Sequence, residues 1–332
     1  MEDAADRKTP VWQQTALAVS TGLCLAVSAC HWFQPDWLAA LTLAPPWFWL
    51  LPGLLLVRLG YRRDRRRRSV AVLVLWLLFT GVFVEELRSL VRFGRTPTQE
   101  WIAAREQGRA IRVVSLNCCL GNVRAAAEVA AYEPDIVLLQ ESPGREAIEE
   151  LARELFGEGG RVVCGYDTSI LTRWRIEPRP AAPSSDFVHG VATLPSGMAV
   201  DVVSLRLNPP VGRLDFWSPG FWRDHRNNRV IHRDQIRDVM DALDGSPTNH
   251  VIVGGDFNAP AGDGALAHLR PRLHDTFRRA GRGWGNTGTN EFPLFRVDQI
   301  WASRGLRAES VRAQRTVHSD HQMVVCDLVV GE

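Results

Sequence analysis

The octapeptide Val251-Ile252-Val253-Gly254-Gly255-Asp256-Phe257-Asn258 decides how the rest of the chain is interpreted. Its three successive β-branched residues favour a buried strand, and the glycine pair permits a sharp change of backbone direction where that strand ends. Asp256 and Asn258 stand two residues apart, so an extended backbone directs both side chains to the same side. A carboxylate and an amide at a strand end can orient a water molecule and hold a charged oxygen, although Asp and Asn also favour ordinary turns.

Composition sets few limits on function. The chain has 332 residues and a net charge of +2, which fits one large domain or two small ones and gives no global attraction to a polyanion. Its six cysteines include no CxxC pair, so a structural zinc site is disfavoured and buried free thiols are expected. Roughly the first ninety residues are strongly apolar, whereas the remainder has the composition of a water-soluble globule.

Three apolar runs near the N-terminus predict transmembrane helices at approximately residues 12–33, 37–57 and 69–84. The first two are long enough to cross a bilayer core of about 30 Å, and membrane helices tolerate the prolines of the second. The third rises only about 24 Å, and its flanking arginines could extend to the interface. A cleaved signal peptide or a soluble helical domain is less favoured, because three runs follow one another without a clear cleavage site.

An arginine cluster within residues 58–68 predicts the orientation of these helices. Such clusters beside apolar spans stay on the cytoplasmic side, which places everything after Val84 outside. The protein is therefore predicted to be an integral protein of the cell membrane with its C-terminal domain on the extracytoplasmic side. If the third run only dips into the bilayer, the C-terminal domain would instead be cytoplasmic.

The pattern predicts a transmembrane region over residues 1–88, a polar arginine-rich linker over 89–109 and one domain over 110–332. Apolar strand patterns alternate with helical spacing in that domain, which indicates an α/β or α+β fold. The segment 211–228 mixes aromatic residues with arginines. Because it contains Pro219-Gly220, it is predicted to be a loop, either a packed lid or a surface that faces substrate or membrane. Helical spacing resumes over 230–243.

Polar residues repeatedly adjoin these apolar strands. Each has an ordinary structural interpretation as a turn residue, a helix-start acid or an ion-pair partner. As an ordered set they predict a chemical site, and they are Asn117, Glu141, Asp256, Asn258, Asp298, Asp320 and His321.

The motifs around these residues resemble those of the endonuclease/exonuclease/phosphatase superfamily, and they occur in that superfamily's order over residues 110–332. They are Ser115-Leu116-Asn117, the run Pro134 to Glu141, Gly255-Asp256-Phe257-Asn258, the run Arg296 to Ile300, and Ser319-Asp320-His321. The resemblance implies an α+β fold, a four-layer α/β/β/α sandwich with its site at one edge, that follows the three-helix transmembrane region.

The resemblance also implies a divalent cation. Asn117 and Glu141 would bind or support it, and Asp320 would lie near it. Mg²⁺ is the expected ion, with Mn²⁺ as an alternative, because hard oxygen ligands suit these ions better than zinc.

The remaining roles follow from the same resemblance. Asp256 would orient or deprotonate the attacking water, and Asn258 would hold a phosphoryl oxygen. His321 would contact the phosphate as an imidazolium, and Asp298 would orient it and raise its pKa. A metal ion and a cationic histidine would stabilise the negative charge that develops during phosphoester hydrolysis.

Two positions depart from the superfamily's pattern. Members usually carry a histidine where this chain has Arg206, at the end of Ser204-Leu205-Arg206. An arginine can clamp a phosphate but cannot act as a general acid at neutral pH, so the group that protonates the leaving oxygen is left open. Cys119 stands where some nucleases place an acidic residue.

Together these features predict a membrane-anchored, divalent-metal-dependent hydrolase of the phosphodiesterase, nuclease or phosphatase type. Its partners would be a phosphoester substrate, either nucleic acid or a phospholipid headgroup, and the bilayer, with no obligate protein partner evident. One alternative is a catalytically silent member that binds phosphorylated ligands. Others are an intracellular nuclease-like enzyme, if the third apolar run does not span, and a membrane assembly protein whose soluble domain is only a scaffold.

Overall fold

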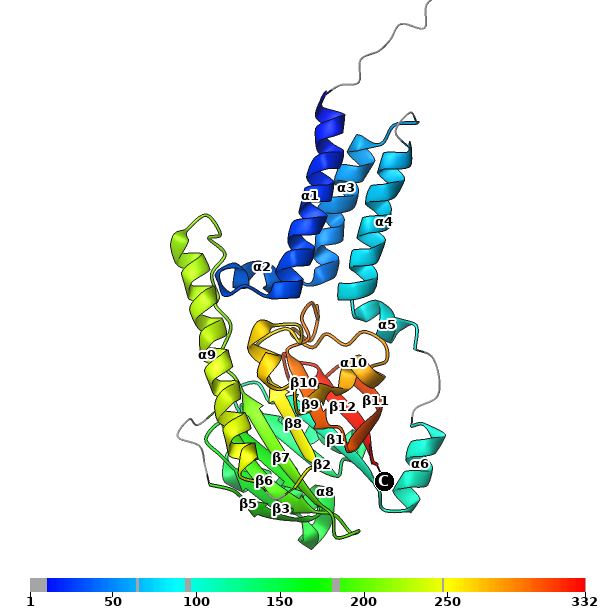
Figure 1. Cartoon of the computed structure of the whole chain (residues 1–332). Coiled ribbons are helices and arrows are strands. Elements are labelled where there is room, and N and C mark those ends of the chain that lie inside the picture. Colours follow the sequence, from blue (N-terminus) through cyan, green and yellow to red (C-terminus); the bar gives the residue numbers. More distant parts are fainter. Residues whose placement is uncertain (1–10, 64–65, 93–96, 181–185, 247, 332) are drawn as a thin grey trace, which may run out of the picture. The chain divides into compact units, whose positions relative to one another are not determined.

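The computed structural model describes residues 11–63, 66–92, 97–180, 186–246 and 248–331. The chain forms two compact units, Met1–Leu87 and Arg88–Glu332 (Figure 1). Each unit has its own apolar core, so each is described by itself.

The N-terminal unit is a bundle of three longer helices, α1 (Val11–Phe33), α3 (Leu50–Gly60) and α4 (Arg66–Phe83). Trp76 lies at its centre, 1% exposed, and its Nε1 donates a hydrogen bond to Ser20 Oγ. Gly53 permits this packing, because a Cβ atom there would lie 2.1 Å from the Trp76 ring. Small residues that let helices approach closely are typical of membrane helix bundles. The outer faces carry exposed apolar side chains that include Leu25, Leu51, Leu55, Leu77 and Leu78.

The prediction of three membrane-crossing helices is supported only in part. Among the described residues, α1 is long and apolar enough to cross a membrane, and only 22% of its most apolar window is buried. The predicted second span is two helical segments, Asp36–Leu43 and Pro46–Gly60, which meet the same criterion only as a pair and are bent by 81°. The predicted third span, α4, does not meet it, because three of its 18 residues are arginines at its start. The described helices thus offer one span, or two if the bent pair is a single span.

The C-terminal unit confirms the predicted mixture of helices with two sheets. The first sheet has the order β11 (Leu306–Gln314), β12 (Met323–Val330), β1 (Ala110–Asn117), β2 (Ile136–Gln140), β4 (Thr168–Thr172), β3 (Arg161–Cys164). The second has the order β5 (Arg175–Pro178), β6 (Phe187–Thr193), β7 (Ala199–Arg206), β8 (Val251–Asp256), β10 (Asp298–Ser303), β9 (Leu273–Asp275). The short strands β5 and β9 and the strand β11 lie outside the patterns recognised in the sequence.

The alternation of side chains along each strand builds the layers. In β8, Ile252 belongs to the core between the two sheets, whereas Val251 and Val253 belong to a second core on the outer face. That outer core includes Ile236 and other residues of α9 (Pro219–Asp244). On the far side, α7 (Val123–Ala127) and α8 (Arg145–Phe156) cover the first sheet through a third core. Helices therefore lie outside both sheets, as the sandwich prediction requires (Figure 1).

The prediction that residues 211–228 form a loop is wrong for its second half. Helix α9 begins at Pro219, and the Ser218 hydroxyl accepts a hydrogen bond from Gly220 N. A serine cap followed by proline at the first helical position is a favourable helix start, because proline has no N–H that would need a partner there. The Pro-Gly pair therefore starts the helix rather than interrupting it.

The segment that precedes the sandwich is attached to it at two places. Ser89 O accepts from Gly283 N, and the Arg92 guanidinium donates to the carbonyl oxygens that end α10 (Thr276–Ala280). Further along, α6 (Gln99–Glu106) is capped by Thr98, and Trp101 is 5% exposed in a small core with Val329 of β12. Among the described residues before β1, Ser89 and Arg92 are therefore bonded to the C-terminal unit, and α6 packs on its first sheet.

Gly255→Ala is expected to destabilise the C-terminal unit strongly. Gly255 has φ +146° inside β8, and a Cβ atom there would lie 1.9 Å from Leu205 O. The expected loss is about 3 kcal/mol of unfolding free energy, since a side chain would add backbone strain and a main-chain clash. Urea unfolding of the purified chain in detergent, followed by circular dichroism, measures it. Gly262→Ala is the matched control, because open space surrounds Gly262, and an equal midpoint for both variants would contradict the prediction.

Candidate functional site

Strand register in the second sheet brings three candidate residues side by side. The parallel pairing of β7 with β8 sets Arg206 opposite Asp256, and the antiparallel pairing of β8 with β10 sets Asp298 opposite the same residue. Asp256 and Asp298 are each 1% exposed. Two carboxylates are thus held next to one another in a water-poor place at one edge of the sheet.

The first sheet supplies the amide and the carboxylate that face them. Parallel pairing of β1 with β2 sets Asn117 beside Gln140, and Glu141 follows at once. Asn117 Nδ2 donates to Asp256 Oδ2 at 3.1 Å and to Glu141 Oε1 at 3.2 Å. This one amide therefore joins the two sheets at the candidate site, and its Oδ1 accepts from Cys119 N.

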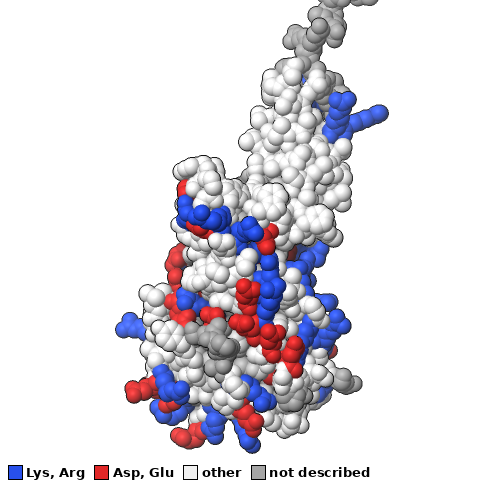
Figure 2. All heavy atoms as spheres, turned by 60° about the vertical axis from the view of Figure 1, so that its left-hand side comes forward, with Lys and Arg blue, Asp and Glu red and all other residues white. Residues whose placement is uncertain are grey.

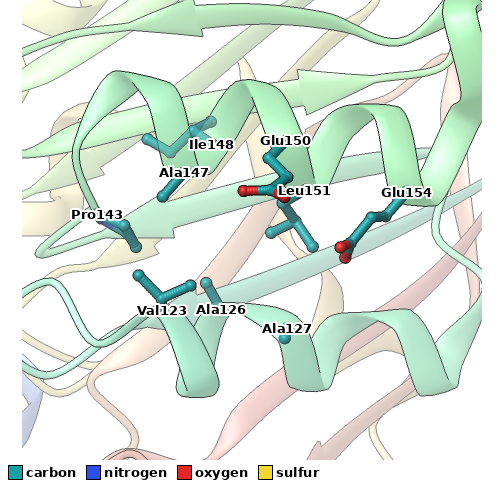
Figure 3. Close-up of a pocket in the computed structure, with 9 residues that line it drawn as sticks. All are labelled: Val123, Ala126, Ala127, Pro143, Ala147, Ile148, Glu150, Leu151 and Glu154. Carbon is teal, nitrogen blue, oxygen red and sulfur yellow. The ribbon is translucent and has the colours of Figure 1, made fainter.

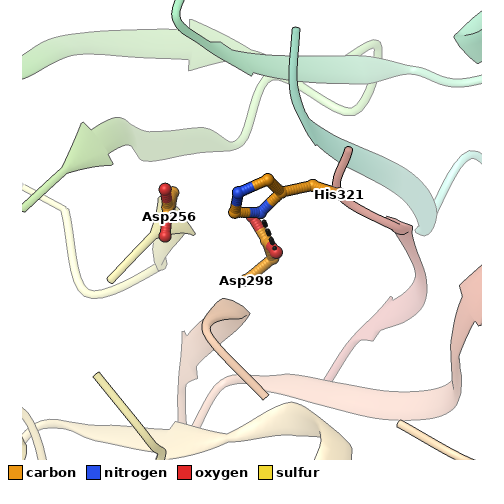
Figure 4. A group of neighbouring side chains, drawn as sticks. All are labelled: Asp256, Asp298 and His321. Atoms are coloured by element: carbon orange, nitrogen blue, oxygen red, sulfur yellow. Dashed lines mark hydrogen bonds and ion pairs between the residues drawn. The ribbon is translucent and has the colours of Figure 1, made fainter. Parts of the chain in front are cut away.

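His321 completes the group. Its Nδ1 lies 2.8 Å from Asp298 Oδ2, and the imidazole lies between Asp298 and Asp256 (Figure 4). The Ser319 hydroxyl, which the sequence did not single out as a site residue, accepts from His321 N and donates to Asn117 O. A buried serine thereby links the histidine to the strand end that carries Asn117.

Burial and the neighbouring charges shift the pKa values of Asp256 and His321. Burial, together with the negative charge of Asp298, raises the pKa of Asp256 to about 7. Burial opposes protonation of His321, but the charge and hydrogen bond of Asp298 and the charges of Asp256 and Asp320 outweigh it and raise its pKa to about 10. His321 is therefore an imidazolium at neutral pH, whereas Asp256 is poised near the pH at which a carboxylate can take up a proton.

Arg206 forms ion pairs with two carboxylates. Its guanidinium donates to Glu141 Oε1 at 2.7 Å and to Asp167 Oδ2 at 2.8 Å, and its side chain is 24% exposed. Asp167 was not among the residues predicted from the sequence, because it lies in an ordinary turn between β3 and β4. Within the described chain, Arg206 Nε is buried without a hydrogen-bond partner. The guanidinium is therefore fixed in direction and still has donor capacity.

Asn258 and Asp320 lie at the margins of the site. Asn258 has φ +47°; its N–H donates to Asp256 Oδ1 and its Nδ2 to Leu207 O, which engages one of its two amide hydrogens. Asp320 is exposed, and its charge helps to raise the pKa of the Cys119 thiol, for which burial is the larger cause. Structure thus brings every predicted residue to one end of the two sheets, with Asn258 and Asp320 outermost.

The donor atoms at this end fit a hard divalent cation. The described contacts around the site connect five carboxylates with two cationic side chains, Arg206 and His321. The carboxylates are Glu141, Asp167, Asp256, Asp298 and Asp320. Asp298 Oδ1 is buried without a hydrogen-bond partner among the described residues. An excess of negative charge built from oxygen ligands is the environment that Mg²⁺ and Mn²⁺ prefer.

Two donor sets compete for such an ion. Asp256, Asp298 and His321 offer ligand atoms within 4.8 Å of one another. His321 Nδ1, however, already contacts Asp298 Oδ2 at 2.8 Å, and the imidazole pKa is raised to about 10, so a cation would have to displace a proton from this ring. Glu141 is the better candidate, because its side chain is 16% exposed and is a hard oxygen donor, although its oxygens already accept from N–H groups of Asn117, Arg206 and Leu120.

One pocket lies apart from these residues. It has a volume of about 60 Å³ and lies between α7 and α8 (Figure 3), lined by Val123, Ala126, Ala127, Pro143, Ala147, Ile148, Glu150, Leu151 and Glu154. None of the candidate site residues lines it, and it is too small for an ordinary organic ligand.

Comparison with solved structures finds the same fold in several enzymes. A family protein from Bacteroides thetaiotaomicron has 16% identity and a TM-score of 0.51, with 67% of this chain and 98% of that chain covered. The mannosyl-6-phosphatase of the same organism has 17% identity and a TM-score of 0.50, with coverage of 66% and 99%. The human nocturnin catalytic domain with bound sulfate has 19% identity and a TM-score of 0.50, with coverage of 67% and 94%. At these identities the likeness establishes the fold alone.

The family itself is established by sequence. No curated protein matches the chain. Residues 114–321, more than half of the chain, match the endonuclease/exonuclease/phosphatase family, and this range includes every candidate site residue from Asn117 to His321. The protein therefore belongs to the endonuclease/exonuclease/phosphatase family, whose members hydrolyse phosphoester bonds.

Proposed function

We propose that this protein is a membrane-anchored, divalent-metal-dependent phosphoesterase that cleaves its substrate by attack of water. The observation that carries the proposal is the joining of the two sheets by Asn117, which donates to both Glu141 and Asp256 beside the Asp298–His321 pair. An amide, three acids and an imidazolium at one end of a sandwich suit hydrolysis of a phosphate ester, because that reaction needs a base and several positive charges.

In this proposal Asp256 acts on the water. It is buried, its Oδ1 is oriented by Asn258 N and its Oδ2 by Asn117 Nδ2, so its direction is set before substrate arrives. The raised pKa makes it a better proton acceptor than an exposed carboxylate. Preorganisation of this kind avoids the cost of reorienting a flexible side chain during the reaction.

His321, Asn258 and Arg206 would bind the phosphate. The imidazolium of His321, oriented by Asp298, supplies a positive charge and an N–H donor. Asn258 retains an amide hydrogen for a phosphoryl oxygen, and the Arg206 guanidinium adds a fixed cation. Arg206 cannot supply a proton to the leaving oxygen, so this position distinguishes the chain from the histidine-bearing pattern of its family.

Glu141 and Asn117 would hold the divalent cation, Mg²⁺ or Mn²⁺, with Asp320 nearby. When bound, the cation would neutralise part of the carboxylate excess and polarise the phosphoryl group. Arg206 shares Glu141 with that cation, since its guanidinium donates to Oε1 of the same carboxylate. We infer that the arginine weakens metal binding while it strengthens phosphate binding.

The N-terminal unit would anchor the enzyme. Helix α1 is long and apolar enough to span, and most of its surface is not covered by the rest of that unit, unlike the core helix of a soluble protein. If α4 crosses the membrane as well, an arginine cluster 58–68 on the cytoplasmic side puts the catalytic unit on the extracytoplasmic side of the cell membrane by the positive-inside rule. If only α1, or α1 and the bent pair, cross, no span follows the cluster, and the catalytic unit shares its cytoplasmic side.

Both diesters and monoesters remain within the proposed chemistry, since the site contacts described above address the phosphoryl group rather than the leaving group. Solved structures of the same fold include a mannosyl-6-phosphatase and nocturnin. A catalytically silent phosphate binder is the second candidate, because Arg206 replaces a potential acid. Hydrolysis itself distinguishes the two.

Asp256→Asn and His321→Gln are each expected to lower kcat/KM for a reactive aryl phosphodiester by at least about a hundredfold, because they remove the base or the phosphate-facing cation. The measurement is release of nitrophenolate by the full-length chain in detergent with Mg²⁺ or Mn²⁺, with and without EDTA.

Glu177→Gln and His268→Gln serve as controls, because both residues are exposed and lie outside the site. EDTA should abolish turnover in the wild type and both controls. Absence of turnover on aryl phosphoesters, DNA, RNA and phospholipids with either metal would favour the silent binder and reject the proposal.

Arg206→Met is expected to raise KM for the soluble ester by about tenfold, because a charged phosphate contact is lost. The same change should tighten Mn²⁺ binding measured by calorimetry, since Glu141 loses its competing cation. Arg213→Met is the matched control: Arg213 also bridges two carboxylates, Asp215 and Asp224, but outside the site. Weaker Mn²⁺ binding in Arg206→Met would show that the arginine supports the metal site instead.

A further inference from the structure

Helix α9 extends beyond the sheet at the end where the site lies. Asn208, two residues after the end of β7, contacts α9 at Asn228 (Nδ2 to Oδ1, 2.6 Å) and at His232 (backbone O to Nε2, 2.7 Å). The helix begins nine residues before Asn228, which corresponds to about 13 Å of helix past that level. Figure 1 shows this end of α9 rising above the strand ends.

The projecting end carries apolar side chains in water. Leu214, Phe216 and Trp217 are 87%, 65% and 75% exposed. We call residues 213–224 the aromatic tip. Figure 2, turned to bring α9 forward, shows uncharged surface at this end above a band of Arg and Asp side chains. A contiguous exposed group of large apolar residues marks an interaction surface.

The aromatic tip is built rather than loose. Arg213 donates to Asp215 Oδ1 at 2.9 Å and to Asp224 Oδ2 at 2.6 Å, which ties the loop to the first turns of α9. Trp222 Nε1 donates to Phe216 O at 2.9 Å, and the Phe216 and Trp217 rings pack edge to face. These contacts hold the apolar side chains outward, which a merely unfolded loop would not do.

Other exposed apolar side chains, which we call the apolar rim, lie in the loops that carry or contact site residues; they are Leu120, Tyr166, Phe292 and Val317. Leu120 N donates to Glu141, Tyr166 precedes Asp167, and Asn290 N bonds Asp320 O in the loop that also carries Phe292. The exposed fractions are 91% for Leu120, 90% for Tyr166, 78% for Phe292 and 82% for Val317. The rim of a site for a free, fully charged phosphoester would instead favour polar side chains.

Two further observations identify the occupant as a lipid bilayer. Ser89, in the first residues of the C-terminal unit, is held beside Gly283, at the start of the loop that leads to Asp298, and the chain before it is strongly apolar. The aromatic tip also mixes Trp and Phe with the exposed Arg223, and the exposed Arg226 follows it on α9. Such mixtures suit the bilayer interface, where rings enter the headgroup layer and guanidinium groups meet lipid phosphates.

Single-stranded nucleic acid fits this surface less well. Stacking of bases needs aromatic faces along a positively charged groove. Here the aromatic residues lie on a projecting end, and the central cation of the tip, Arg213, is neutralised by two aspartates.

We propose that the C-terminal unit docks on the bilayer surface through the aromatic tip and the apolar rim, so that the site faces the membrane and its substrate is the phosphoester headgroup of a lipid in that membrane. The docking surface rests on the exposed side chains of the tip and the rim and does not depend on catalysis, whereas the substrate class rests on the proposed phosphoesterase function. Docking turns encounter with a lipid headgroup into a two-dimensional search at high effective concentration.

The catalytic test compares two substrates in one preparation of the full chain reconstituted in phosphatidylcholine–phosphatidylglycerol vesicles. The triple variant Leu214→Ser, Phe216→Ser, Trp217→Ser should hydrolyse vesicle phospholipid about tenfold more slowly, because apolar insertion is lost. It should hydrolyse a water-soluble aryl phosphodiester at the wild-type rate. Ile231→Ser is the matched control, since Ile231 is a 45% exposed residue on the same helix about 18 Å from its start. It should leave both rates unchanged.

The docking test is independent of catalysis. Wild type and Trp217→Phe are placed in nanodiscs of ordinary or brominated phosphatidylcholine, and the difference in their fluorescence isolates Trp217. Brominated lipid should quench that difference signal, and single-stranded oligonucleotide should not. An unquenched signal, or quenching by the oligonucleotide alone, would overturn the docking surface.

The two failures are distinguishable. Hydrolysis of the soluble ester or of oligonucleotides without hydrolysis of vesicle phospholipid would overturn the lipid substrate while leaving the phosphoesterase intact. Equal lipid turnover by the triple variant and the wild type would also overturn it. Hydrolysis of no ester, with Trp217 still quenched by brominated lipid, would reject the proposed function and keep the docking surface.

Discussion

The hydrogen bond from Asn117 Nδ2 to Asp256 Oδ2 is the contact on which the site depends. It crosses from one sheet to the other, so the distance between the sheets at this end fixes the distance between the two halves of the site. Asp256 is almost fully buried, and a buried carboxylate is costly unless its oxygens are satisfied. The core between the sheets therefore does more than stabilise the fold: its thickness sets how closely Asn117, Glu141 and Asp256 can approach.

Charge balance explains the rest of the arrangement. Asp298 and Asp256 lie opposite one another in adjacent strands, and like charges at that separation oppose joint ionisation. His321, protonated between them, relieves that repulsion on one side, and Arg206 relieves the charges of Glu141 and Asp167 on the other. The carboxylates still outnumber the cations, so the proposed divalent ion would offset charge that the side chains leave unbalanced.

Local pattern predicted the strand ends well because one rule governs them. A buried strand stops where its last polar residue can reach water or a partner, so the pattern alone placed Asn117, Glu141 and Asp256 at strand ends and Asp298 at a strand start. Their meeting at one edge was predicted only through the resemblance to the family. Asp167 could not, since only the tertiary pairing of β4 with β2 brings its turn to Arg206. The start of α9 was misjudged because Pro219-Gly220 was interpreted as a breaker, whereas the Ser218 cap makes the same proline a helix start. The third apolar run does not meet the length and hydropathy criterion for a span, because helix α4 starts at Arg66 and so includes three arginines. The sequence pattern had started that run after them, at residue 69.

Helix α9 shows how one element can serve fold and function at different points along its length. From Ile236 to Leu243 it packs on the outer core of the second sheet, and it could not be removed without exposing that core. Its first turns follow the exposed rings of the aromatic tip, Phe216 and Trp217, which gain little from folding because they stay in water. A helix that needed only to cover the sheet could begin near Asn228, where it meets Asn208. The additional turns, with an arginine bridging two aspartates to stiffen them, are accounted for if their apolar surface is buried against something other than the protein itself, as the proposed docking on a bilayer would do.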